Sequence, residues 1–335
     1  MLRNHLSQNT TMEVNGLKCT LNMPKAVERV RNADGSEGVA GLPPYNQRSA
    51  YPVDEYQDSP DSWMRGSATE GSYFVPIEPE HGMWLDFQAN MGHSHHVAAV
   101  VSVQGVDPLT GMPVAAKMEQ YQDKCPKHNT SFQMNRYCPD CKFEWHPQNY
   151  LSSNNGSPFW IDGFRTEDGV IRQWFFTEDE CKGVAAQLIG KKRVHAIGIK
   201  FFLSKNPKPI MQSRRYAYAG NVESTFGCGP MMSCAPAAAS ANVYSATKCL
   251  ASNVSDSSFR PARMRGPVKQ LEIGAGAKIK QLINPDPETL DFWQPEPAGT
   301  LYINYCDVET ANRILDGNKC EKASDGFLQG LKLKD

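Results

Sequence analysis

Two short cysteine motifs with nine residues between them constrain the fold of this chain more than any other feature. The first is Cys125-Pro-Lys-His128 and the second is Cys138-Pro-Asp-Cys141, so each offers two potential metal ligands three positions apart. A structural zinc ion is held by four such groups, with bonds of about 2.3 Å to sulfur and about 2.0–2.1 Å to nitrogen. The spacing therefore predicts one structural zinc ion per chain, bound by Cys125, His128, Cys138 and Cys141.

A site of this kind is closed, because the protein fills all four coordination positions. No position is left for a substrate or a water molecule, so the site indicates folding energy rather than catalysis. His146 lies nearby in the sequence and could replace His128 without changing that role. The alternative is a metal-free loop with free thiols. The aromatic residues of the stretch indicate packing around a short ribbon; they are Phe132, Tyr137, Phe143 and Trp145.

Outside this stretch the chain is rich in short runs of β-branched and aromatic residues. Val97–Val103 is a continuous apolar run, which is typical of a strand buried on both faces. An Asp-Gly turn at Asp168–Gly169 separates two further runs and predicts a hairpin. We therefore expect a mainly β fold: an antiparallel β-sandwich or jelly-roll-like core, with a zinc-ribbon-like insertion and two short helices.

The two helices are indicated by their capping residues. Thr177 and Glu180 have the spacing of a capping box, which predicts a helix that ends at Gly190. Asp307 is placed to cap a second short helix, which Gly317 would end.

Composition divides the chain into four regions. They are an extended N-terminal arm at 1–70 with one strand (Met12–Leu21), a β-rich core at 71–218 that includes the zinc knuckle insertion at 122–150, a small-residue linker at 219–258, and C-terminal strands with a short helix at 259–335. The linker is typical of a flexible connection, or of a conformable segment packed between elements or subunits. The C-terminal region would either complete the core or form a small α+β appendage.

A histidine cluster, His93-Ser-His95-His96, is the strongest indication of an enzyme. Alternate residues of a strand share one face, so His93 and His95 could bind a second metal with His81 or Asp86. A structural or surface cluster is the simpler interpretation.

The His-x-His pair resembles the start of the first cupin motif, which implies metal-dependent catalysis on a β core. In cupins a glutamate follows within a few residues, whereas this chain has apolar residues at 98–101 and no carboxylate before Asp107. The second cupin motif is absent from the sequence as well, so the cupin-like motif is incomplete.

Charge and apolar patterning limit the partners and the compartment. The chain has 35 basic and 36 acidic residues and a net charge of −1, which is not the basic excess of a nucleic-acid-binding protein. The N-terminus lacks the apolar core of a signal peptide, and no run approaches the roughly 18 apolar residues of a membrane span. We expect a cytoplasmic protein whose ten cysteines are zinc ligands and thiols rather than a disulfide framework.

These observations favour a non-enzymatic structural, assembly or binding protein with a structural zinc site. A protein partner or self-association is expected, because arms and conformable linkers beside a rigid core suit subunit contacts. A metal-dependent enzyme built on the histidine cluster is the alternative. A third possibility is carbohydrate or peptide binding through Trp84, Trp160 and Trp174, although their strand context favours core packing.

Overall fold

The structure is a computed structural model that describes residues 9–41, 44–67, 69–156, 158–166, 168–209 and 269–317. The elements below belong to a unit formed by residues 1–208 and 260–335, while a second unit comprises residues 209–259. The linker predicted at 219–258 lies outside the described residues.

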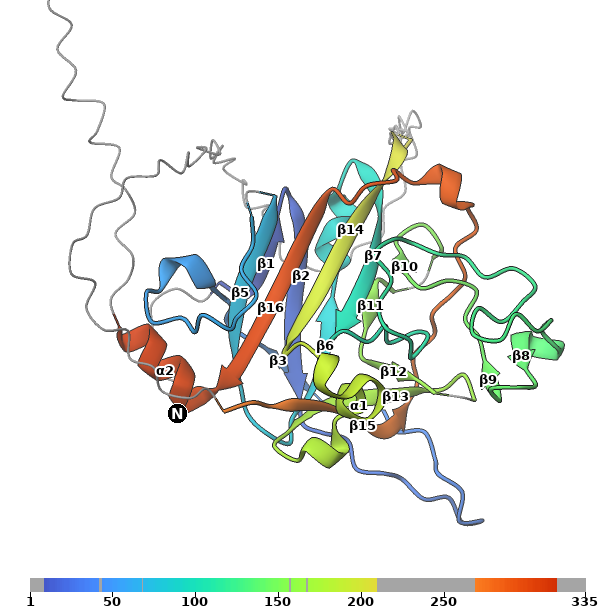
Figure 1. Cartoon of the computed structure of the whole chain (residues 1–335), viewed down its shortest axis with the longest axis horizontal. Coiled ribbons are helices and arrows are strands. Elements are labelled where there is room, and N and C mark those ends of the chain that lie inside the picture. Colours follow the sequence, from blue (N-terminus) through green and yellow to red (C-terminus); the bar gives the residue numbers. More distant parts are fainter. Residues whose placement is uncertain are drawn as a thin grey trace, which may run out of the picture. The chain divides into compact units, whose positions relative to one another are not determined.

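Strands make up most of the regular structure (Figure 1). They are β1 (Thr11–Val14), β2 (Leu17–Pro24), β3 (Tyr45–Gln47), β4 (Tyr51–Pro52), β5 (Glu70–Ile77), β6 (Gly82–Asp86), β7 (His95–Val103), β8 (Tyr137–Cys138), β9 (Phe143–Glu144), β10 (Leu151–Ser152), β11 (Trp160–Ile161), β12 (Gly163–Arg165), β13 (Ile171–Thr177), β14 (Ala196–Pro207), β15 (Glu272–Ile279) and β16 (Gly299–Asp307). The two α-helices among the described residues are α1 (Val184–Ile189) and α2 (Val308–Asp316).

These strands form two large sheets and one small ribbon. The eight-stranded sheet has the order β1-β2-β6-β13-β12, with β3 beside β2, β11 beside β6 and β15 beside β13. The six-stranded sheet has the order β10-β7-β14-β16-β5-β4, and β8 and β9 form a separate two-stranded ribbon. The C-terminal strands thus belong to the two large sheets: β15 pairs with β13 in the first, and β16 lies between β14 and β5 in the second.

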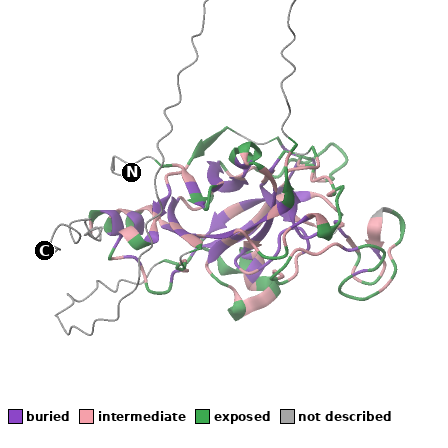
Figure 2. Ribbon diagram, turned by 90° about the horizontal axis from the view of Figure 1, so that it is seen from above, coloured by how far each residue is buried: buried purple, intermediate pink, exposed green. Residues whose placement is uncertain are grey.

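The main core lies between the two large sheets. On β7, Val97 and Val101 face this core, whereas Ala98 and Val100 face a smaller apolar cluster on the other side. Leu21 of β2 and Trp174 of β13 supply the same core from the eight-stranded sheet. Because alternate residues point to opposite faces of a strand, this distribution defines a β-sandwich. Figure 2 shows the buried residues concentrated in the strands and the exposed ones mainly on the loops.

The predicted mainly β fold with two short helices is therefore confirmed, with one difference in strand direction. β16 pairs with β5 in parallel, from Thr300 beside Glu70 to Asp307 beside Ile77, so the six-stranded sheet is mixed. A parallel pair needs a long crossover connection, and these two strands are separated by most of the chain.

The prediction of a single strand in residues 1–70 is wrong. The run Met12–Leu21 is divided by a two-residue turn, in which Asn15 and Gly16 have φ angles of 51° and 79°. Two positive φ angles define a type I′ turn, whose twist matches that of a hairpin. The resulting strands β1 and β2 belong to the eight-stranded sheet, so this part of the predicted arm is part of the core.

The helices begin and end close to their predicted positions. The Asp307 carboxylate accepts a hydrogen bond from the Thr310 amide at 2.9 Å and caps α2. α1 begins later than the predicted capping box, because Asp179 first caps a 3₁₀ turn at Glu180–Lys182. Neither helix has the length or apolar character needed to cross a bilayer.

Candidate metal centre

The two cysteine motifs fold into turns of the same geometry. The Asn129 amide donates to the Cys125 carbonyl at 2.7 Å, and the Lys142 amide donates to the Cys138 carbonyl at 3.0 Å. Asn129 and Lys142 both adopt a positive φ, 56° and 59°. A left-handed conformation is unfavourable for residues other than glycine. Its occurrence at the same position of both turns indicates that each turn is shaped to present its two side chains.

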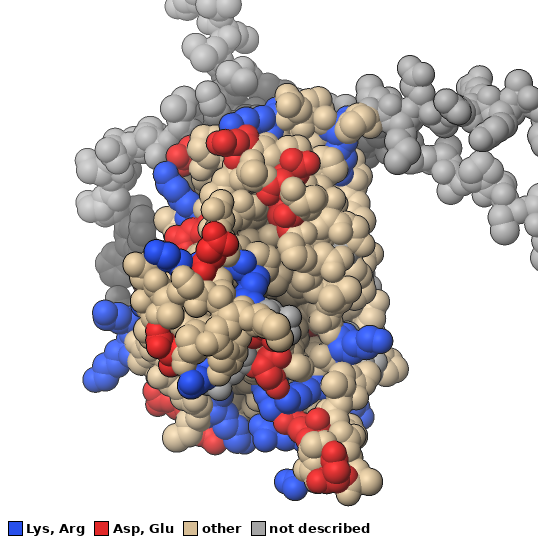
Figure 3. Space-filling model, turned by 90° about the vertical axis from the view of Figure 1, so that its right-hand side faces the viewer, with Lys and Arg blue, Asp and Glu red and all other residues tan. Residues whose placement is uncertain are grey.

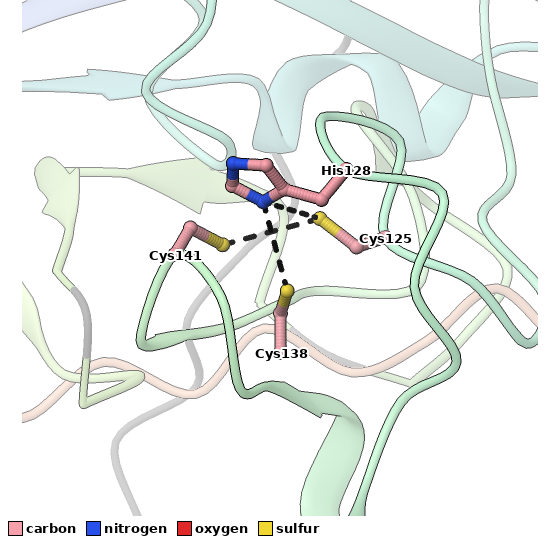
Figure 4. Close-up of side chains that lie close together, drawn as sticks. All are labelled: Cys125, His128, Cys138 and Cys141. Atoms are coloured by element: carbon pink, nitrogen blue, oxygen red, sulfur yellow. Dashed lines mark hydrogen bonds between the residues drawn. The ribbon is translucent and has the colours of Figure 1, made fainter.

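The four predicted ligands converge on one point (Figure 4). The Nδ1 atom of His128 lies 3.7 Å from Cys125 Sγ and 3.8 Å from Cys138 Sγ, and the Sγ atoms of Cys125 and Cys141 are 3.9 Å apart. All four ligand atoms lie within 4.8 Å of one another. With ordinary zinc bond lengths, the edges of a tetrahedral site are about 3.5–3.8 Å long. The cluster can therefore hold a metal ion such as zinc with little rearrangement.

The donor set also fits zinc chemically. Three thiol groups and one imidazole in a tetrahedral arrangement match the preference of zinc, whereas magnesium and calcium require oxygen ligands. Burial raises the pKa of Cys125 to about 11, although the amides of His128 and Lys127 oppose this effect. At Cys138 burial also raises the pKa, but the Cys141 amide and the His128 ring outweigh it and bring the pKa to about 6. The Cys138 turn is thus arranged to stabilise a thiolate, which is the form that binds metal.

A small apolar cluster surrounds the four ligands and is separate from the main core. Tyr121 and Trp145 are buried beside Cys125 and Cys138, and Phe132 and Phe143 pack against them. An aromatic cluster of this size is a weak core on its own, and a structural metal is one way in which small modules reach stability.

Contacts of Arg165 and His146 join the ribbon to the sandwich. Arg165 of β12 forms an ion pair with Glu144 of β9 at 3.1 Å, and its side chain is only 8% exposed. The ring nitrogens of His146 lie 3.1 Å from the carbonyl oxygens of Gln148 and Ile283. Burial lowers the pKa of His146 to about 4. His146 therefore anchors the ribbon to the strand-rich core, and the structure places His128, not His146, beside the three cysteines.

The histidine cluster at the start of β7 is arranged differently. His95 Nδ1 lies 2.8 Å from the Ser204 carbonyl oxygen, and His93 Nδ1 accepts a hydrogen bond from the His95 amide at 3.1 Å. His81 instead lies 3.4 Å from Glu78. Within the described residues, no third histidine, cysteine or carboxylate completes a metal cluster with His93 and His95.

The three tryptophans singled out from the sequence pack against other residues. Trp174 is fully buried in the main core. Trp84 is buried on the outer face of the eight-stranded sheet, where Trp160 and Tyr45 meet it edge to face at 5.7 and 4.8 Å between ring centroids.

Comparisons with protein-family models, with curated proteins and with solved structures found no match for this chain. The fold and the site define its class as a mainly β protein with a Cys3His cluster on a small ribbon.

The sequence predicts only a packing role for Trp145, whereas in the structure this residue also contacts a ligand of the metal centre. Its indole Nε1 donates a hydrogen bond to Cys141 Sγ at 3.4 Å, from a position four residues further along the chain. Hydrogen bonds from outside the ligand shell orient the ligands and stabilise their charge.

We expect Trp145→Phe to weaken zinc binding by about tenfold, because the hydrogen bond to the Cys141 thiolate is lost while the ring packing is largely kept. Competition with a chelator of known zinc affinity measures the change. Trp63→Phe is the matched control, because Trp63 is buried in a different apolar cluster. Equal zinc affinity of the Trp145→Phe variant and the unchanged chain would show that the indole hydrogen bond is unimportant.

Proposed function

We propose that this protein is a non-enzymatic binding or assembly protein whose ribbon is folded around one structural zinc ion. The observation that carries the proposal is the closed set of three thiols and one imidazole within 4.8 Å of one another. With four protein ligands, a bound zinc ion has no position for substrate and contributes stability instead.

The enzymatic alternative has less support. It requires a second metal at His93 and His95, and both of their Nδ1 atoms are engaged with neighbouring backbone groups. No carboxylate among the described residues joins them.

The surface of the ribbon supports contact with another protein. Met134, in the turn between the two motifs, is 88% exposed. Methionine is enriched at protein interfaces, where its flexible side chain fits varied partners. A metal-bound ribbon would present this side chain on a rigid support, which lowers the entropy lost on binding.

The charge distribution favours a protein partner over nucleic acid. On the face that Figure 3 presents, Lys and Arg side chains are interspersed with Asp and Glu side chains. Binding to a phosphate backbone relies on a continuous basic surface, and the net charge of −1 supplies no general excess.

Light scattering after size-exclusion chromatography tests the self-association version of the proposal. We expect the mass to rise with protein concentration, and this rise to be reduced in Met134→Glu, which places a charge on the exposed contact. Leu290→Glu is the control, because Leu290 is also an exposed apolar residue but lies outside the ribbon. A strictly monomeric chain at all concentrations would contradict self-association.

A further inference from the structure

The three cysteines of the cluster differ in exposure. Cys125 and Cys138 are 1% and 0% exposed, whereas Cys141 is only partly buried. Of the three cysteine ligands, Cys141 is thus the one that a small reagent in solution reaches most easily.

A cavity gives access to Cys141. This open cavity of about 590 Å³ lies between the ribbon and the sandwich and is lined by Cys141, Trp145 and Lys127 of the ribbon and by Arg165 of β12. Neither Cys125 nor Cys138 lines it. A zinc-bound cysteine is a thiolate, and the thiolate is the nucleophile in thiol oxidation.

The geometry favours Cys125 as the disulfide partner of Cys141, although all four ligand atoms lie within 4.8 Å of one another. The Sγ atoms of Cys141 and Cys125 are 3.9 Å apart, and the disulfide bond length is about 2.05 Å. Each of these cysteines belongs to a different motif, so a bond between them would join the two turns directly. A movement of about 2 Å by side chains in a surface ribbon is sufficient to form it.

We propose that Cys141 is an oxidation site at which a peroxide releases the zinc ion; this inference rests on the proposed zinc site. The Cys141 thiolate attacks one peroxide oxygen, which breaks the O–O bond, forms a sulfenic acid and releases hydroxide. The Cys125 thiolate then attacks the Cys141 sulfur, forms the disulfide and expels a second hydroxide. The two sulfurs lose two electrons, the peroxide gains them, and two protons from solvent convert the hydroxides to water. Zinc loses two of its four ligands and dissociates.

The test uses the zinc-loaded full chain and hydrogen peroxide. A zinc-sensitive dye measures release, and peptide mapping by mass spectrometry identifies the disulfide. We expect one zinc released per chain together with a Cys125–Cys141 disulfide. A disulfide between any other pair of the three ligands would overturn the proposal. So would retention of zinc at a peroxide dose that oxidises Cys181, an exposed thiol outside the cluster.

Two matched variants separate the roles of the cysteines. Cys141→His keeps four ligands but removes the accessible thiolate, so we expect zinc release to slow by roughly tenfold or more. Cys181→Ser removes an exposed thiol outside the cluster, keeps all four ligands and the reactive pair, and is expected to release zinc as fast as the unchanged chain. Equal rates for the two variants would contradict the proposal. If Cys141→His fails to bind zinc, identification of the disulfide in the unchanged chain still tests the proposal.

The zinc content before peroxide is added is a separate measurement. A chain that carries no zinc refutes the proposed function, whereas a chain that carries zinc and keeps it under peroxide refutes only the oxidation site.

Discussion

Cys138→Ser is expected to abolish stoichiometric zinc binding and to unfold the ribbon while leaving the sandwich folded. Cys138 is fully buried, and its Sγ lies 3.8 Å from His128 Nδ1. A hydroxyl group is a much poorer zinc ligand than a thiolate, and structural zinc sites contribute an apparent free energy of about 10–16 kcal/mol at neutral pH. Because the apolar cluster of the ribbon is small and separate from the main core, we expect the loss to remain local.

Hydrogen exchange followed by mass spectrometry measures this effect by segment. Amides of the ribbon, including β8 and β9, should lose their protection, whereas those of β7 and β14 in the main sheet should keep it. Cys181→Ser is the control, since Cys181 is an exposed thiol outside the cluster. A Cys138→Ser ribbon that stays as protected as the unchanged ribbon would show that metal does not stabilise it.

Asp162→Asn is expected to stabilise the protein at neutral and alkaline pH. Asp162 is fully buried between β11 and β12, and neither carboxyl oxygen has a hydrogen-bond partner among the described residues. Burial raises the pKa of Asp162 to about 7. A buried carboxylate without a partner loses its hydration, and no hydrogen bond or ion pair replaces it. An amide of the same shape carries no charge, so its burial costs less free energy.

The sign of the pH dependence follows from the raised pKa. An unfolded aspartate ionises near pH 3.9, so between about pH 4 and pH 7 the folded chain holds a proton that the unfolded chain has lost. Stability of the unchanged protein therefore falls as pH rises through this window, by an amount on the order of 4 kcal/mol. Asp162→Asn removes this dependence, so its advantage should be small near pH 4, grow up to pH 7 and then level off.

Urea unfolding at several pH values measures the difference, and Asp168→Asn is a control with the opposite sign. Burial raises the pKa of Asp168, but hydrogen bonds from Lys278 and Thr166 outweigh it and bring the pKa to about 2. Its folded pKa is lower than its unfolded one, so Asp168→Asn should reduce stability at neutral pH and lose this effect as pH falls through the window from about 4 to 2. If Asp162→Asn changes the stability by the same amount at every pH, burial does not raise the pKa of Asp162 in the folded protein.

Features encoded within a few residues could be predicted from the sequence. The spacing of the two cysteine motifs specifies four ligands, and the structure brings all four side chains together. The apolar run at Val97–Val103 became part of β7, and Asp307 caps α2. The Asn15-Gly16 pair is also a local hairpin signal, which apolar runs alone do not reveal.

Features that depend on distant partners could not be predicted in this way. β5 and β16 pair in parallel although most of the chain separates them, and no local pattern specifies that choice. His146 resembles a ligand in the sequence, but the carbonyl of Ile283, far along the chain, holds its ring away from the cluster. Aspartate is usually exposed, so the residue type does not predict that Asp162 is buried. Its burial follows from the assembly of the sheet around it.

The most direct test of the central claim is X-ray absorption at the zinc edge, on protein purified without added metal. We expect a tetrahedral shell of three sulfur ligands at about 2.3 Å and one nitrogen ligand at about 2.0 Å. A chain that carries no zinc, or a shell of oxygen and nitrogen ligands without sulfur, would contradict a zinc centre at Cys125, His128, Cys138 and Cys141.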